Sequence, residues 1–276
     1  MPRCGMKVSS VAVLAYACII AMWLCEWLRS RRGCKCNGPH HNFIASNLVI
    51  TYLLSTPITV VILFDWDDTL CPSFDLSERG FTLTSENKCA VTEMELRQLE
   101  ASVIALLEVA FEYGDVHIVT NAETGWVQLS ANKFLPGVLP LLDRVKVISA
   151  RSTYERLFPD NPFRWKYHAF KDNLAMVINH DGVKKNIMSF GDSHYEREAI
   201  RHATHGLANT HTKSIKFKER PKIEQLRRQI ELVTSCFQYL HNHEGDLDLQ
   251  LSISVHVTDD PVEAFEHIDD QHIHDL

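Results

Sequence analysis

The chain has 276 residues, of which 45% are hydrophobic and 23% are charged, and this composition excludes a disordered chain, a collagen and a coiled-coil rod. The length leaves room for one or two domains. The formal net charge is −7, but residues 1–40 carry six Lys or Arg and one acid, whereas residues 244–276 carry ten acids and no Lys or Arg. No basic stripe marks the middle of the chain, so no nucleic acid partner is indicated.

Residues 8–25 are an uncharged, mostly apolar run at the short end of the length that a membrane span needs. Trp23 and Trp27 lie at its end, and four Lys or Arg follow it against two in front. We therefore expect residues 1–28 to be an uncleaved single-pass membrane anchor with the rest of the chain in the cytosol. The alternative is a cleaved signal peptide that delivers the protein to the lumen of the secretory pathway.

Residues 29–57 are predicted to be a linker. The apolar stretch at its end is interrupted by Pro57, which is a structure breaker. Residues 58–64 are then β-branched or aromatic almost without exception. Such a run is typical of a strand buried on both faces of a parallel sheet, so we expect a strand here and not a second membrane span.

Strand and helix patterns alternate after this strand. A capping box begins at Thr92, and apolar residues recur at helical spacing from there to Gly114. Further strands are predicted at 116–119, 145–149, 186–190 and 214–217, and further helices at 125–134, 163–178, 194–204 and 223–241. This alternation predicts an α/β fold with a doubly wound parallel sheet over residues 58–243. Residues 244–276 are predicted to form a last strand, from the alternation between Leu247 and Val257, and an acidic tail.

Polar residues stand where three of the predicted strands end. They are Asp65 and Asp67, Thr120 and Asn121, and Asp192. Because ligands of open parallel sheets bind beyond the carboxyl ends of the strands, we expect these side chains to share one crevice. Lys166, early in the helix at 163–178, is expected to join them, and Lys171 is its rival. Carboxylates, a hydroxyl, an amide and an ammonium together suit a metal ion and a phosphate.

Four segments resemble, in order, the four motifs of the haloacid dehalogenase (HAD) superfamily. They are residues 64–69 (FDWDDT, for D-x-D-x-T after a strand), residues 116–121, residues 165–166, and residues 190–196, in which Glu196 stands for the last Asp of G-D-x-x-x-D. The resemblance covers about residues 58–220 and implies a HAD-like core. Neither insert between the motifs is long enough for a full cap domain. An open site of this kind suits a bulky or macromolecular phosphorylated substrate.

The resemblance implies a Mg²⁺-dependent phosphatase. Asp65 would attack phosphorus and form an aspartyl-phosphate, while Asp67 would protonate the leaving oxygen and then activate water. Asp65 and Asp192 would hold Mg²⁺ with the backbone carbonyl of Asp67. Glu196 would stand behind these ligands, because its longer side chain argues against direct contact with the metal. The residues that would bind the phosphate are Thr120, Asn121 and Lys166.

Two other functions use the same residues. A phosphotransferase would form the same aspartyl-phosphate, and a binding module could keep the fold without turnover. The presence of all the implied catalytic residues argues against the silent module. Asp68 is expected to brace the loop after the first strand. Trp66 and Trp126 are expected either to shape the entrance of the site or to pack in the core.

Overall fold

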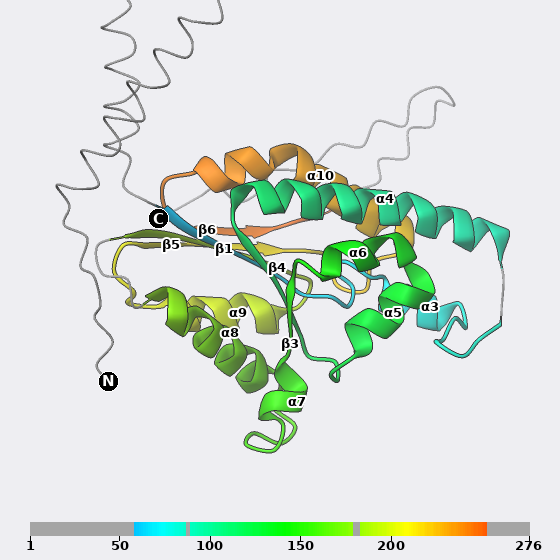
Figure 1. Cartoon of the computed structure of the whole chain (residues 1–276), viewed down its shortest axis with the longest axis horizontal. Helices are drawn as coiled ribbons and strands as arrows, with labels where there is room; N and C mark the ends of the chain where they lie inside the picture. The colour runs from blue at the N-terminus through cyan, green and yellow to red at the C-terminus, as the bar shows by residue number, and fades with distance from the viewer. Residues whose placement is uncertain (1–57, 87–88, 179–182, 253–276) are drawn as a thin grey trace, which may run out of the picture. The chain divides into compact units, whose positions relative to one another are not determined.

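The computed structural model describes residues 58–86, 89–178 and 183–252 (Figure 1). The expected anchor or signal segment, the linker and the tail beyond residue 252 lie outside the described residues. Among the helices of the described ranges, none combines the length and the apolar character that a membrane crossing requires.

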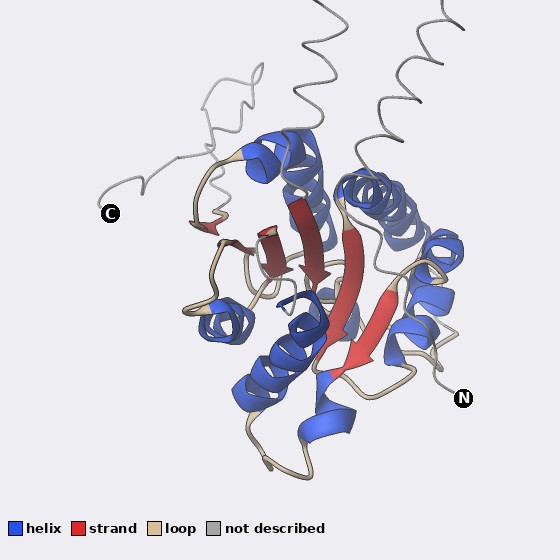
Figure 2. Ribbon diagram, turned by 60° about the vertical axis from the view of Figure 1, so that its left-hand side comes forward, coloured by secondary structure: helices blue, strands red, loops and turns tan. Residues whose placement is uncertain are grey.

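The described strands form a single parallel sheet (Figure 2). Their order in the sheet is β3-β2-β1-β4-β5-β6. Their bounds are β1 Ile58–Phe64, β2 Asp115–Thr120, β3 Lys146–Ser149, β4 Lys184–Gly191, β5 Thr210–Lys216 and β6 Leu247–Gln250. The chain runs from β1 outward to β3 and then returns to place β4 on the other side of β1. The strand order therefore reverses between β1 and β4, which is where ligands bind in sheets of this type.

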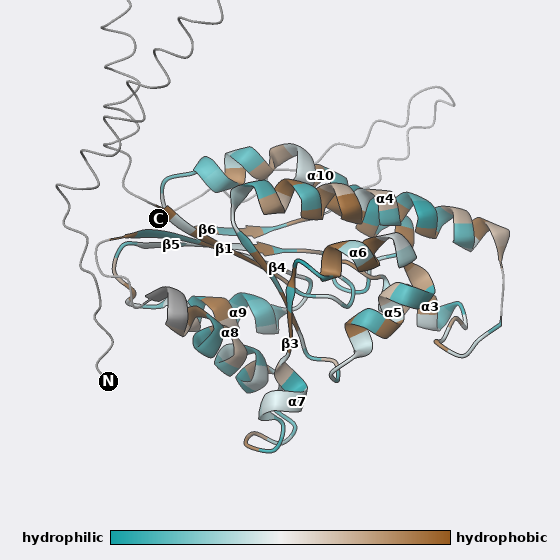
Figure 3. Cartoon of the chain, viewed as in Figure 1, coloured by the Kyte–Doolittle hydropathy of each residue, from teal (hydrophilic) through white to brown (hydrophobic). Residues whose placement is uncertain are grey.

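Helices cover both faces of the sheet (Figure 1). On one face lie α4 (Ala90–Tyr113) and α10 (Ile223–Asn242), and on the other lie α8 (Pro162–Ile178) and α9 (His194–Thr204). Both polar and apolar residues occur along each of these helices (Figure 3). The side chains of β1 alternate between the two cores, with Ile62 and Phe64 on the α4 side and Val61 and Leu63 on the α8 side. This burial on both faces explains the unbroken apolar run.

The predicted α/β fold with a parallel sheet is confirmed, and most predicted elements are present within a few residues. The inserts between the early strands hold short helices that the sequence pattern did not predict, besides the helix predicted at 125–134. The segment between β1 and β2 contains the additional helix α3 (Ser73–Glu78) before α4. The segment between β2 and β3 contains α5 (Trp126–Phe134), as predicted, and then the additional 3₁₀ turn η1 (Pro136–Val138) and helix α6 (Leu139–Leu142). The next crossover contains α7 (Ala150–Tyr154) before α8.

The predicted start of α4 is wrong. The helix begins at Ala90, and its N-cap residue, Cys89, makes no side-chain cap bond. Both residues of the expected capping box are used by Arg79, whose Nη1 donates to Thr92 Oγ1 at 3.3 Å and to Glu95 Oε2 at 2.5 Å. Thr92 therefore does not cap the helix, because its side chain instead accepts a hydrogen bond from Arg79 at the end of α3.

The predicted end of α4 at Gly114 is confirmed, although the reason for the glycine is different. Gly114 is extended, so its conformation is open to any residue. A Cβ atom at this position would lie 2.5 Å from the carbonyl oxygen of Val60. The glycine is therefore required because the chain passes close to the backbone of β1.

Candidate active site

Hydrogen bonds that involve the backbone fix the conformation of the loop after β1. The Asp65 N–H donates to the Phe190 carbonyl at 2.8 Å, which joins the ends of β1 and β4. Asp68 adopts a left-handed conformation, with φ of 56°, and its Oδ1 accepts a hydrogen bond from the Phe74 N–H at 2.9 Å. Asp68 thus braces the loop, and burial raises its pKa to about 6.

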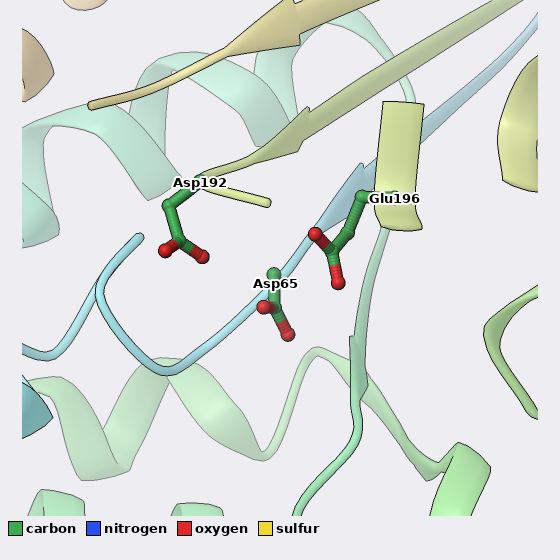
Figure 4. Close-up of side chains that lie close together, drawn as sticks. All are labelled: Asp65, Asp192 and Glu196. Carbon is green, nitrogen blue, oxygen red and sulfur yellow. The ribbon is translucent and has the colours of Figure 1, made fainter. Parts of the chain in front are cut away.

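Three carboxylates meet where β1 and β4 end. Asp65 follows β1, Asp192 follows β4, and Glu196 lies in the first turn of α9. The three side chains lie close together (Figure 4), and one oxygen from each lies within 4.8 Å of the others. Gly191 makes this approach possible, because a Cβ there would lie 2.7 Å from Glu196 Cγ.

Glu196 is placed closer to this group than the sequence led us to expect. Its Oε2 accepts a hydrogen bond from the Ser193 N–H at 3.1 Å, and its Oε1 lies 3.1 Å from Lys166 Nζ. One oxygen therefore completes the capping box at the start of α9, and the other faces the site. By contrast, the group of carboxylates that the described residues bring together, Asp65, Asp192 and Glu196, does not include Asp67.

Lys166 brings the only positive charge that the described residues place against these carboxylates by an ion pair. Its side chain is fully buried, and its Nζ donates to Asp65 Oδ1 at 2.8 Å and to the Val119 carbonyl at 2.5 Å. Its rival Lys171 is exposed, with Nζ 6.0 Å from the centre of the Tyr167 ring. Lys166 therefore lies at the site and Lys171 does not contact it.

Three carboxylates against one ammonium leave the group with excess negative charge. Burial raises the pKa of Asp65 to about 7, although Lys166 opposes this shift. Burial also raises the pKa of Asp192 to about 9, with a further contribution from the charge of Asp65. Like charges held together in a buried site favour protonation or a bound cation. The cluster of Asp65, Asp192 and Glu196 could therefore hold a metal ion.

Asp67 lies beside the cluster and is held by side chains from three elements. Oδ1 accepts hydrogen bonds from Ser73 Oγ and from Trp126 Nε1, the latter at 2.7 Å, and Oδ2 accepts one from Thr120 Oγ1 at 3.4 Å. Trp66 differs from Trp126, because it is fully buried and its Nε1 donates to Ser130 Oγ at 2.8 Å. Of the two tryptophans, Trp126 shapes the site and Trp66 packs in the core.

A cavity of about 460 Å³ opens over these residues. Its lining includes every expected site residue except Lys166, which lies buried beneath it. Asn121 contributes to one wall, where its Nδ2 donates to the Pro162 carbonyl at 3.4 Å, while its buried Oδ1 has no hydrogen-bond partner. Tyr195 and Trp126 are the aromatic residues of the lining. The sequence did not indicate the contributions of Ser73 and Pro162, which lie outside the four motifs, or of Tyr195, which stands at an unspecified position of the fourth motif.

Comparison with protein-family models gives no match, and a search of curated proteins finds no significant relative.

Proposed function

We propose that the chain is a Mg²⁺-dependent phosphate-monoester hydrolase that acts through an aspartyl-phosphate. One observation carries the proposal: the Asp65 carboxylate is paired with the buried Lys166, while a second aspartate of the same loop, Asp67, lies in the same cavity. The four segments that resemble the HAD motifs supply these residues, and they converge where the strand order reverses.

In the first half of the proposed reaction, an oxygen of Asp65 attacks phosphorus. The bond between phosphorus and the ester oxygen breaks, and that oxygen keeps the electron pair and takes a proton from Asp67. Thr120, Asn121 and Lys166 are the proposed phosphate-binding residues. The Lys166 ammonium favours the charged form of Asp65 and so opposes the rise of the Asp65 pKa that burial causes, because an opposite charge nearby stabilises the carboxylate.

In the second half, Asp67 accepts a proton from a water molecule that attacks the phosphorus of the aspartyl-phosphate. The bond between Asp65 and phosphorus breaks, which releases inorganic phosphate and restores the Asp65 carboxylate. The net reaction consumes one water and yields an alcohol and phosphate. Asp67 ends each cycle protonated, so it can serve again as the acid.

Mg²⁺ fits the donor set, because Asp65, Asp192 and Glu196 offer only oxygen ligands, which hard cations prefer. Asp65 and Asp192 are the proposed ligands, and the position of Glu196 makes it a further candidate. When bound, Mg²⁺ would neutralise the charge that develops between the carboxylates and the phosphate.

The proposed substrate is bulky or macromolecular. Between β1 and β2, and between β2 and β3, the described residues form helices that pack on the core of the sheet. The exposed side chain of Tyr195 stands in the lining of the cavity. A site that its own inserts leave open accepts a phosphate carried by a larger body.

The full-length chain is expected to hydrolyse p-nitrophenyl phosphate in the presence of Mg²⁺, to lose this activity in a chelator and to recover it when Mg²⁺ is restored. Asp192→Asn should need at least about 10-fold more Mg²⁺ for half-maximal activity, since a ligand charge is lost. Asp160→Asn, an exposed residue outside the cavity, is the matched control and should respond like the wild type. Full activity in metal-free buffer would refute the metal requirement.

A further inference from the structure

The two oxygens of the Asp67 carboxylate have different surroundings. Oδ1 accepts hydrogen bonds from the Trp126 indole at 2.7 Å and from the Ser73 hydroxyl. Among the described residues, the hydrogen bond that Oδ2 accepts is a long one, of 3.4 Å, from Thr120 Oγ1. The strong donors therefore converge on one oxygen, and the other accepts the long hydrogen bond from Thr120, which lines the cavity together with Asp67.

The indole of Trp126 affects which oxygen of Asp67 carries a proton. An indole N–H donates but cannot accept a hydrogen bond, whereas a hydroxyl such as that of Ser73 can rotate and do either. In a protonated carboxyl group the oxygen without the proton is the stronger hydrogen-bond acceptor. The N–H of Trp126, at 2.7 Å from Oδ1, therefore favours the form of Asp67 in which Oδ1 is unprotonated and the proton lies on Oδ2.

Trp126 is well placed to hold this arrangement. It is the first residue of α5, directly after Gly125, whose left-handed φ of 91° turns the chain into the helix. Its carbonyl accepts a hydrogen bond from Ser130 Oγ at 2.7 Å, and the same Ser130 oxygen accepts from the buried Trp66. The backbone of Trp126 is thus connected to the core through Ser130, while its indole N–H donates to Asp67 in the site.

We propose that Trp126 is a positioning residue that keeps the transferable proton of Asp67 on Oδ2. This inference rests on the proposed function, in which Asp67 donates that proton to the ester oxygen as the phosphorus–oxygen bond breaks and the electron pair goes to the oxygen. Loss of the indole N–H lets the proton reside on either oxygen and lets the carboxyl group rotate. Only leaving groups that need the proton suffer from this loss.

Trp126→Phe tests the proposal with two esters of matched shape, phenyl phosphate and p-nitrophenyl phosphate. Phenolate is a basic leaving group that needs protonation, whereas p-nitrophenolate leaves with little help. We expect kcat for phenyl phosphate to fall on the order of 10-fold more than kcat for p-nitrophenyl phosphate, because a hydrogen bond to a charged group supports the acid. KM for the two esters should change equally.

Two further variants make the result specific. Trp126→His keeps a ring N–H donor and should restore much of the phenyl phosphate rate, which also covers the case in which Trp126→Phe fails to fold. Tyr195→Phe changes the other aromatic residue of the lining, and it should leave the ratio of the two rates as in the wild type, whatever it does to both.

Equal losses on the two esters, or no loss, would overturn the role of Trp126 while leaving the proposed hydrolase intact. A wild-type chain that hydrolyses neither ester in Mg²⁺ would overturn both proposals. A larger loss on phenyl phosphate, reversed by Trp126→His, supports the positioning role, since a merely structural defect would lower both rates together.

Discussion

Asp65→Asn is expected to hydrolyse phosphate esters at least about 10³-fold more slowly than the wild-type chain, because the amide has no anionic oxygen to attack phosphorus. The substitution keeps the shape of the side chain. It also removes one of the three like charges of the cluster, which compensates for the weaker contact with Lys166. The variant should therefore fold, and hydrolysis of p-nitrophenyl phosphate in Mg²⁺ measures the loss.

A circular dichroism spectrum and a urea unfolding curve are the controls for Asp65→Asn, and both should resemble those of the wild type. Turnover at the wild-type rate in a preparation free of deamidated protein would show that Asp65 is not the nucleophile.

Lys166→Met is expected to be the most destabilising single change at the site. The ammonium is fully buried and contacts Asp65 and Glu196, so its removal leaves buried carboxylates without a counter-charge. Breaking a buried ion pair from one side typically costs about 3–5 kcal/mol. The raised pKa of Asp65 lets that group neutralise itself by protonation, so we expect the lower end of this range. The midpoint of urea unfolding measures the change.

Lys171→Met is the matched control, because it makes the same substitution on the same helix at an exposed position. Its free energy of unfolding should stay within about 0.5 kcal/mol of the wild type. A similar small effect for Lys166→Met would contradict the buried ion-pair arrangement on which the proposed mechanism relies.

Much of the fold could be predicted because the local signals are strong. β1 is an unbroken apolar run, and α9 matches its predicted bounds of 194–204 because Ser193 and Glu196 form a capping box at its start. The N-terminal half of β5 was missed, since Thr210 to Lys213 is polar and strand formation there depends on pairing with β4. Tertiary contacts also decided the start of α4, where Arg79 takes both residues of the expected capping box.

The candidate site was predictable where strand ends carry motifs, and less so where distant segments meet. Asp65, Thr120, Asn121 and Asp192 line one cavity as the topology rule predicted. Sequence spacing, however, could not show that Glu196 reaches the carboxylate cluster, which depends on the missing side chain of Gly191. The hydrogen bond between Trp126 and Asp67 also joins residues far apart in the chain, so no local sequence pattern predicts it.

Asp67→Asn tests the central claim, that Asp65 carries the phosphoryl group and Asp67 completes turnover, most directly. With p-nitrophenyl phosphate and Mg²⁺, the leaving group needs little acid, so the first half of the reaction proceeds while the water of the second half lacks its base. We predict a burst of p-nitrophenolate, followed by very slow turnover, and a phosphoryl group that acid quenching and peptide mass spectrometry locate on Asp65. A phosphoryl group on another residue, or hydrolysis that continues at the wild-type rate without any covalent adduct, would contradict the mechanism.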